Sequence, residues 1–318
     1  MAGVRQAAKC PNSGQMFTTY VEETYLPYAK RTTKPSTYAS RETFWNLYIK
    51  PRVAKYALRD FTTAIVYGLL CDVAHKHRVN VGSVAKLRAV LHSIFQYALN
   101  TGDLPGRNPV EGVILPESAT KPKPTVAASR DEVQAILPAL KGKPMARAAV
   151  AVMAFTGVRP GEARGPRWEE WDRAEQHIHV RRSIWHTQEG ETKTESSVRF
   201  VAVTDELRWI LLDLWNAQGC PMGGFIFAGR KGQPINLDNL ARRIVRPALK
   251  QAKIEWHSWY ALRRFHATAI RKESGSSDTA SKALGNTKEV LDKHYLKPDG
   301  VLPDVRKAVK DAVSGLVH

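Results

Sequence analysis

The chain has 318 residues, of which 43% are hydrophobic and 25% are charged. This length suggests two domains of ordinary size, and the composition is that of a globular protein with apolar residues for two cores. A disordered chain, a collagen-like chain and a coiled-coil rod are excluded. Lys and Arg number 48 and Asp and Glu number 30, which gives a formal net charge of +18 at pH 7.

The positive charge is spread along the chain. The first 125 residues contain 17 basic and 8 acidic residues, so they account for half of the net charge. Two folded units that each carry such an excess favour an extended polyanion, above all a nucleic acid, as partner. One alternative is that the partner is a ribosome or a membrane surface. Another is that the charge only keeps a basic protein soluble.

The cysteines and the apolar runs argue for a cytoplasmic protein. Cys10, Cys71 and Cys220 show no CxxC spacing, so neither a disulfide framework nor a cysteine zinc site is indicated. The longest apolar runs fall short of the ~18 residues that a membrane span needs, and the N-terminus lacks the apolar core of a signal peptide. We expect a cytoplasmic, nucleoid-associated protein with no membrane partner.

The first half of the chain has helical patterning. Residues 1–14 are predicted to be a loose N-terminus and residues 15–114 a helical domain. Only about 14 residues precede the first helix, so a further N-terminal domain is expected to be either absent or not included in this sequence. Helices are predicted over residues 15–31, 36–49, 62–76 and 83–100, with Val84, Leu87, Leu91, Ile94 and Ala98 as the buried stripe of the fourth. Residues 115–128 are rich in proline and predict a linker.

The second half, residues 129–318, is predicted to be a mixed α/β domain that begins with capping-box spacing from Ser129 to Glu132. The fold class is therefore mainly α with a small antiparallel β-sheet. The alternation of apolar residues predicts strands over 177–184 and 197–203, with a turn at 188–191. Helices are predicted over 146–156, 206–217, 236–252, 259–273, 279–284 and 303–316.

Several common site motifs are absent from the sequence. The segment GFIFAGRK at 224–231 lacks the Gly-Lys-Ser/Thr ending of a phosphate loop, and neither HExxH nor GxSxG occurs. His177 and His179 share one face of a predicted strand, but no third ligand at metal-binding spacing accompanies them. We expect no cofactor and no metal.

Four segments of the second half together carry a chemical signal. Arg159 follows a predicted buried helix, with Glu162 three residues later, and Lys193, Arg263 and Tyr295 follow along the chain. Singly, each is an ordinary surface or core residue. Together, the guanidinium groups can hold phosphodiester oxygens, a lysine can protonate the leaving oxygen, and a phenol can form a phosphodiester that a hydroxyl attacks again.

In their order, these segments resemble the boxes of the tyrosine recombinases, in the phage-integrase branch. The matching segments are TGVRPGE at 156–162, TKT at 192–194 with Arg199, ALRRFHAT at 261–268 and LGN through Tyr295 at 284–295. Residues 15–110 resemble the helical, SAM-like core-binding domain of that family. The resemblance therefore covers about residues 15–300.

The resemblance implies a mechanism and a set of roles. Tyr295 attacks the scissile phosphate, which leaves a 3′-phosphotyrosyl link and a free 5′-hydroxyl. Arg159 and Arg263 bind the phosphate oxygens, Lys193 acts as general acid, and Glu162 orients Arg159. The reaction needs neither ATP nor metal.

The resemblance also implies the partners. These are double-stranded DNA, a homotetramer on DNA assembled from free monomers that exchanges strands through a Holliday junction, and accessory DNA-bending or directionality proteins. The predicted helix over 303–316 would pack on a neighbouring protomer or fold back on its own domain.

Two positions depart from the family pattern. Tyr260 stands where the family usually has histidine, and Asn286 stands where it usually has histidine or tryptophan. Both side chains can donate a hydrogen bond, and neither exchanges a proton near neutrality as histidine does. Both are included in the predicted catalytic set, whereas His257 and His266 are predicted to be bystanders.

Contacts with DNA are also predicted outside the catalytic set. Arg242, Arg243 and Arg246 lie on one predicted helix and can face phosphates, although a solvated face is the alternative. Lys86 and Ser93 lie off the apolar stripe of the fourth helix and can meet a groove.

The sequence favours a recombinase that integrates or excises a phage or another mobile element. One alternative is a recombinase that resolves chromosome dimers, which has the same chemistry and a different biological role. A DNA-binding relative with impaired catalysis would fit Tyr260 and Asn286. A type IB topoisomerase fits the helical domain less well.

Overall fold

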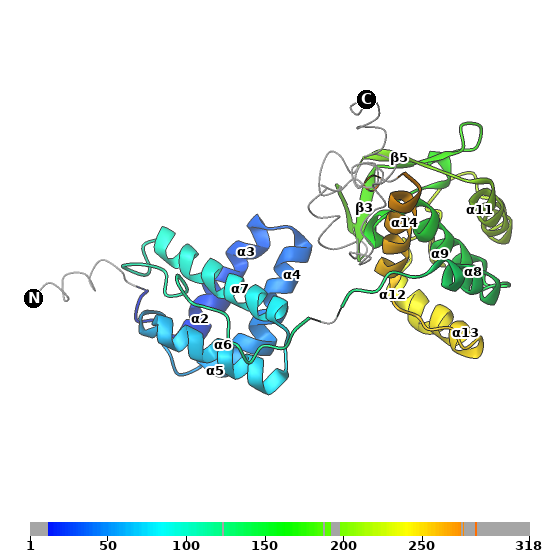
Figure 1. The fold of residues 1–318 in the computed structure, drawn as a ribbon. Coiled ribbons are helices and arrows are strands. Elements are labelled where there is room, and N and C mark those ends of the chain that lie inside the picture. The colour runs from blue at the N-terminus through cyan, green and yellow to red at the C-terminus, as the bar shows by residue number, and fades with distance from the viewer. Residues whose placement is uncertain are drawn as a thin grey trace, which may run out of the picture. The chain divides into compact units, whose positions relative to one another are not determined.

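The structure is a computed structural model of the chain, and it describes residues 12–122, 124–186, 188–191, 198–274, 276 and 284. The chain forms two compact units, Met1–Pro124 and Thr125–His318 (Figure 1). The predicted helices over 279–284 and 303–316 fall wholly or almost wholly outside the described residues.

The first unit is built from helices around an aromatic core. Wider, π-helical turns at Val21–Tyr25 and Trp45–Ile49 join α2 to α3 and α4 to α5 into continuous helical stretches. Phe17 lies at the centre of the core and stacks on Phe95 with ring centroids 5.1 Å apart. The helices are α2 (Phe17–Tyr20), α3 (Leu26–Thr32), α4 (Pro35–Phe44), α5 (Lys50–Val53), α6 (Thr63–His77) and α7 (Val81–Asn100).

Two predicted helix boundaries in this unit are wrong. The second stretch continues through Pro51 to Val53, although it was expected to end before the proline. The π-helical turn precedes Pro51, and this departure from regular α-helical bonding accommodates a ring that would clash with the carbonyl four residues back. Helix α7 begins at Val81 because Asn80, not Ser83, is its cap: Asn80 Oδ1 accepts the Ser83 amide at 2.9 Å.

The predicted stripe of α7 is buried throughout, and Thr62 caps α6 because its side chain accepts the Ile65 amide. The segment 115–128, predicted as a linker, is partly held by the two cores. Ala119 is buried in the first core, and the amide of Ala128 donates to the Ala261 carbonyl at 3.1 Å in the second unit. The length of chain that neither core holds is therefore shorter than the proline content suggests.

The second unit packs its helices around α9, most of whose residues are buried. Helices α11 and α14 lie against α9 (Figure 1). Ser129 and Glu132 form the predicted capping box of α8, with the Glu132 amide 3.0 Å from Ser129 Oγ. The helices are α8 (Arg130–Ala139), α9 (Pro144–Thr156), α10 (Pro160–Ala163), α11 (Asp205–Ala217), α12 (Leu237–Leu240), α13 (Arg246–Gln251) and α14 (Trp259–Ser274), with a π-helical turn, Ala241–Val245, between α12 and α13.

The strands form two small antiparallel sheets, in the orders β1-β2-β5 and β3-β4. Strands β2 and β5, which lie within the two predicted strands, pair with each other, and Ile178 lies opposite Val201. The strands are β1 (Trp171–Asp172), β2 (His177–Val180), β3 (Arg182–Trp185), β4 (Gln188–Glu191) and β5 (Arg199–Ala202).

The strand predicted over 177–184 is instead two strands in different sheets, and the turn predicted at 188–191 is strand β4. The chain turns between β3 and β4, where His186 has a φ of +53°. The sequence of β4, QEGE, has no apolar alternation, and its partner positions include Arg182, opposite Glu191, as well as Ile184, opposite Glu189. A strand paired through polar residues carries the pattern of a turn.

The described segments include no helix that is both long enough and apolar enough to cross a lipid bilayer.

The turn after α9 gives a test of packing. Gly157 caps α9 with a φ of +62°, and a Cβ there would lie 2.7 Å from Leu284 Cδ2 and still closer to the His266 ring. Gly142 also has a positive φ, of +77°, but open space around it. We expect Gly142→Ala to cost about 1 kcal/mol, from backbone conformation alone, and Gly157→Ala to cost about 2–4 kcal/mol because a clash is added. Calorimetric unfolding measures both, and equal losses would contradict the tight packing.

Candidate active site and DNA interface

The first arginine is positioned by the turn between α9 and α10. Arg159 precedes α10, and Glu162 in the first turn of that helix reaches back to it. Glu162 Oε2 accepts the Arg159 amide at 3.0 Å, and Oε1 accepts Arg159 Nη1 at 2.5 Å. The Glu162 side chain is 3% exposed, and that of Arg159 is 24% exposed. The carboxylate thus fixes both the backbone and the side chain of Arg159.

Arg199 brings a second guanidinium to the same carboxylate. It opens β5, and its Nη2 lies 3.2 Å from Glu162 Oε2. Burial alone would raise the pKa of Glu162, but the charges of Arg199 and Arg159 and the hydrogen bonds from Arg159 outweigh burial and lower that pKa. Glu162 therefore stays ionised, and two guanidiniums around one carboxylate leave one net positive charge.

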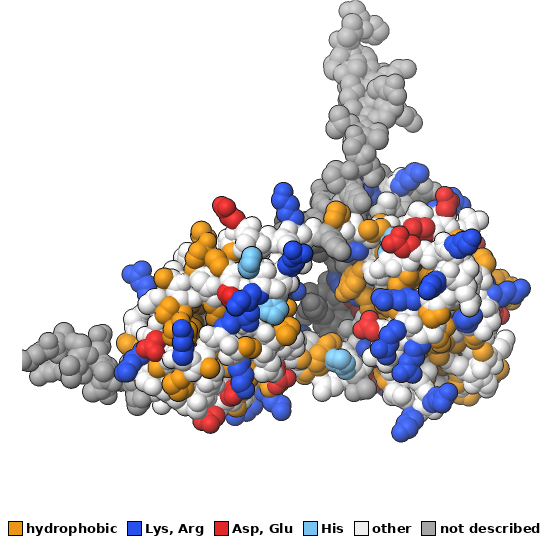
Figure 2. All heavy atoms as spheres, turned by 90° about the horizontal axis from the view of Figure 1, so that it is seen from below, with side chains coloured by type: hydrophobic (Ala, Val, Ile, Leu, Met, Phe, Trp, Pro, Cys, Tyr) orange, Lys and Arg blue, Asp and Glu red, His pale blue; other side chains and the backbone are white. Residues whose placement is uncertain are grey.

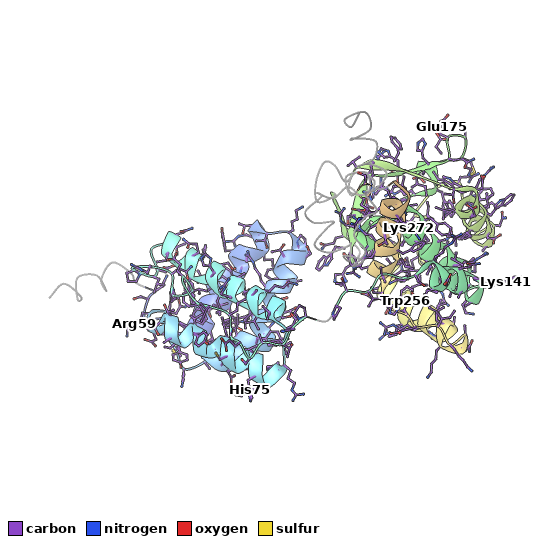
Figure 3. All side chains as sticks on the ribbon, viewed as in Figure 1. Arg59, His75, Lys141, Glu175, Trp256 and Lys272 are labelled. Atoms are coloured by element: carbon purple, nitrogen blue, oxygen red, sulfur yellow. The ribbon has the colours of Figure 1, made fainter. Side chains whose placement is uncertain are left out.

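Arg263, on the side of α14 that faces α9, is fully buried. Its Nη1 donates to the carbonyl of Gly157 and its Nη2 donates to the carbonyl of Leu284 at 3.0 Å. The structure therefore brings the arginines of two distant segments to one turn of the chain, because Gly157 stands two residues before Arg159. In Figure 3, Trp256 and Lys272 mark the loop before α14 and its last turn.

His266 lies at this turn, although it was predicted to be a bystander. Its ring packs against Gly157, from the same helix as Arg263. Burial is the main cause that lowers the pKa of His266 to about 4; a hydrogen bond with the Ala154 backbone opposes it, and the charges of Arg263 and Arg199 add to it. The spacing of three residues from Arg263 was the available signal, since it places both side chains on one side of a helix.

Of the other predicted positions, the structure describes Tyr260 and His257. Tyr260, in the first turn of α14, is 45% exposed. His257 contacts α8, where its Nε2 lies 3.0 Å from Glu132 Oε1. Lys193, Asn286 and Tyr295 lie outside the described residues.

The predicted DNA-contact residues are exposed except for Ser93. Arg242 and Arg246 line one pocket of about 390 Å³, together with Asp238, Asn239, Ala241, Trp256, His257, Ser258 and Trp259. Arg242 Nη2 donates to Asn239 Oδ1 at 3.0 Å, and Arg243 is exposed beside it. On α7, Lys86 is exposed, whereas Ser93 Oγ is 2.5 Å from the Tyr25 hydroxyl. On the face seen in Figure 2, Lys and Arg side chains are spread over each unit.

Among the side chains that the structure describes, no three His, Cys, Asp or Glu residues are grouped as a metal site requires.

The chain belongs to the phage integrase family, whose model matches residues 128–299. A protein described as "Tyrosine recombinase XerC-like", from Caldanaerobacter subterraneus subsp. tengcongensis, is 25% identical over 288 residues, which cover 80% of this chain and 72% of that protein. The resemblance to the tyrosine recombinases is thus confirmed.

Solved structures share the fold. The Tn1549 transposon integrase in complex with a circular intermediate DNA superposes with a TM-score of 0.73 at 14% identity, over 95% of this chain and 99% of that one. A lambda integrase tetramer bound to a Holliday junction gives a TM-score of 0.67 at 18% identity, over 96% of this chain and 83% of that one. The predicted fold class is therefore confirmed.

The buried histidine gives a prediction on pH. The pKa of His266, about 4 in the folded chain, lies below the ~6.5 of an unfolded histidine, so the folded state binds fewer protons between these values. The neutral ring therefore favours folding fully above about pH 6.5, and that contribution falls by about 2 kcal/mol at pH 5.

We expect His266→Phe to reduce the loss of unfolding free energy between pH 7.5 and pH 5 by about this amount. Urea unfolding of both proteins at the two pH values measures the difference. The control is His75→Phe, at an exposed histidine of the first unit (Figure 3). This variant should lose as much unfolding free energy between the two pH values as the wild type does. If His266→Phe lost as much unfolding free energy between the two pH values as the wild type does, the His266 ring would have the same pKa in the folded and unfolded states.

Proposed function

We propose that this phage integrase family member is a site-specific DNA recombinase that integrates or excises a phage or mobile element. The observation that carries the proposal is the ion-paired group Arg159, Glu162 and Arg199 next to the buried Arg263. These side chains form a rigid, positively charged site that can bind a phosphodiester. Fixed positive charge stabilises the charge that develops during phosphoryl transfer without reorganisation at the moment of reaction.

In the proposed reaction, the phenol oxygen of Tyr295 attacks the scissile phosphorus and the bond from phosphorus to the 5′-oxygen breaks. The leaving 5′-oxygen takes a proton from Lys193, and the phenol proton passes to solvent. The product is a 3′-phosphotyrosyl link and a free 5′-hydroxyl. A 5′-hydroxyl of another strand can reverse the step, so bond energy is conserved and no ATP is consumed.

The described cations have different parts in this proposal. Arg159 and Arg263 bind the non-bridging oxygens, Arg159 as the more exposed of the two and Arg263 from its position beside Gly157. Glu162 is a positioning residue that holds Arg159. Tyr260 and Asn286 are proposed to donate hydrogen bonds to the phosphate in place of the family's usual side chains.

A second candidate is a DNA-binding relative with impaired catalysis. It is favoured by Tyr260, because a phenol cannot exchange protons near neutral pH as a histidine can. The two candidates differ in whether a covalent DNA adduct forms. A chromosome-dimer-resolving role has the same chemistry and is distinguished by where the target site lies in the genome.

The same proposal extends to domains and assembly. Residues 15–114 would form the core DNA-binding domain, 115–128 the linker and 129–318 the catalytic domain. Free monomers would assemble as a tetramer on DNA, with accessory DNA-bending or directionality proteins, and the segment 303–316 would pack on a neighbouring protomer. The lambda integrase tetramer on a Holliday junction supports this arrangement by its similar fold.

The covalent step can be tested directly. The substrate is a duplex that the protein has selected from random-sequence DNA, with a nick near the cleaved position. Cleavage then releases a short strand that carries the free 5′-hydroxyl. This strand diffuses away and cannot reverse the reaction, so the adduct accumulates. We expect a covalent complex on denaturing gels that is lost in Tyr295→Phe, while duplex binding by that variant stays within about twofold, because the hydroxyl adds little to binding. Tight binding without an adduct in the wild type would support the impaired relative.

The exposed arginines give a test of DNA binding. We assume that Arg243 and Arg246 each neutralise one phosphate. The plot of log affinity against log salt concentration should then be less steep by about 1 in each single variant, Arg243→Ala and Arg246→Ala, than in the wild type. Fluorescence anisotropy with the selected duplex over a salt series measures the slope. Lys141→Ala, at an exposed lysine between α8 and α9 (Figure 3), is the control. If neither variant changes the slope, these two arginines face solvent and do not contact phosphates.

A further inference from the structure

Arg164 is a buried arginine that the proposed mechanism does not use. It follows α10 directly and is 8% exposed. Its Nε donates to the Ile235 carbonyl at 2.6 Å, its Nη1 to the Ile184 carbonyl at 3.1 Å, and its Nη2 to the His186 carbonyl. One side chain therefore joins the end of α10 to β3, to the turn after β3 and to the segment before α12.

The surroundings of Arg164 are suited to holding backbone. Burial lowers its pKa and the charge of Asp238 partly offsets this, while the hydrogen bonds of the guanidinium go to neutral carbonyls. A guanidinium has donors in a rigid planar fork, so it can bond three backbone segments at fixed angles. A lysine ammonium carries its donors at one point and cannot reproduce that geometry.

Two glycines show how closely the same segment sits on β3. A Cβ on Gly161 would lie 2.5 Å from Ser183 Oγ, and a Cβ on Gly165 would lie 2.5 Å from the Arg182 carbonyl oxygen. Arg182 Nη1 also donates to the Gly165 carbonyl at 3.0 Å. Strand β3 is thus packed directly on the backbone that follows Arg159.

The hairpin fixed in this way leads to the proposed general acid. Strand β3 pairs with β4, which ends at Glu191, two residues before Lys193 in the sequence. On the far side of Lys193 in the chain, β5 begins at Arg199, which is paired with Glu162. Strand β4 is therefore joined to the α10 segment through its partner β3, which Arg164 holds, and β5 is joined to it through Glu162.

We propose that Arg164 is a positioning residue for the proton-donating step, because it fixes hairpin β3–β4 on the segment that carries Arg159 and Glu162. Arg164 does not touch the substrate in this proposal, since its guanidinium is buried among carbonyls. The proposal rests on the proposed function, in which Lys193 protonates the leaving oxygen.

The test separates proton donation from every other part of the reaction. The wild-type adduct is first mapped on the selected duplex to find the cleaved phosphate. Two suicide duplexes are then compared, one normal and one in which sulfur replaces the 5′-bridging oxygen at that phosphate. A thiolate leaves without being protonated, so the sulfur duplex does not need the general acid. The quantity measured is the rate of adduct formation on the sulfur duplex divided by that on the normal duplex.

This ratio does not depend on how much of a preparation is folded, because both rates scale with the same active fraction. Arg164→Lys keeps the charge and loses the fork, whereas Arg164→Met also loses the charge and is used only if it folds. We expect the ratio to rise by about tenfold or more in Arg164→Lys and by about a hundredfold or more in Lys193→Ala. The control is Arg147→Met, which removes the ion pair of Arg147 with Asp213 and should leave the ratio within twofold of the wild type.

The outcomes are distinct. A raised ratio in Arg164→Lys supports the positioning role. If Lys193→Ala raises the ratio and Arg164→Lys does not, then Arg164 serves only the fold and the proposal is wrong while the proposed function stands. If the wild type forms an adduct but Lys193→Ala leaves the ratio unchanged, the general-acid assignment is wrong, and the role of Arg164 falls with it.

Discussion

The attraction between one buried carboxylate and two guanidiniums organises the second unit. Glu162 is almost fully buried and would be costly as an ion by itself, but Arg159 and Arg199 compensate for its desolvation. The carboxylate in return keeps two like charges close together in a partly buried place. Because the two arginines come from a turn after α9 and from a β-strand, the same ion pairs join the helical and the sheet parts of the unit.

The turn at Gly157 is where this group meets α14. A glycine is required there, since the backbone has a positive φ and the His266 ring fills the place of a side chain. The carbonyl of that glycine also accepts a hydrogen bond from Arg263. Helix packing between α9 and α14 thus determines how far apart the arginines of two family boxes lie, and His266 can be neutral beside them because burial and the nearby charges disfavour its protonation.

The supporting contacts are made largely by backbone. Arg164 binds carbonyls, two glycines let β3 approach the α10 segment, and the first residue of β5 is held by Glu162. Such contacts fix geometry without adding to the charge that faces a polyanion. The exposed basic residues of each unit are then available for a long-range attraction that salt screens, which is a separate contribution from the buried group.

By itself, the sequence determined the fold class, the helical character of residues 15–110, the capping box at Ser129, the buried stripe of α7 and the family boxes. These are local patterns, because spacing and capping act between residues that are near in the chain. It did not separate β2 from β3 or find β4, whose polar residues are paired only through a partner strand. It also missed the contact of Arg199 with Glu162, the position of His266 and the role of Arg164 in joining three segments. Those contacts join residues that are distant in the chain, as Arg164 and Ile235 are at 71 positions apart, and only the packing of the folded chain brings such residues together.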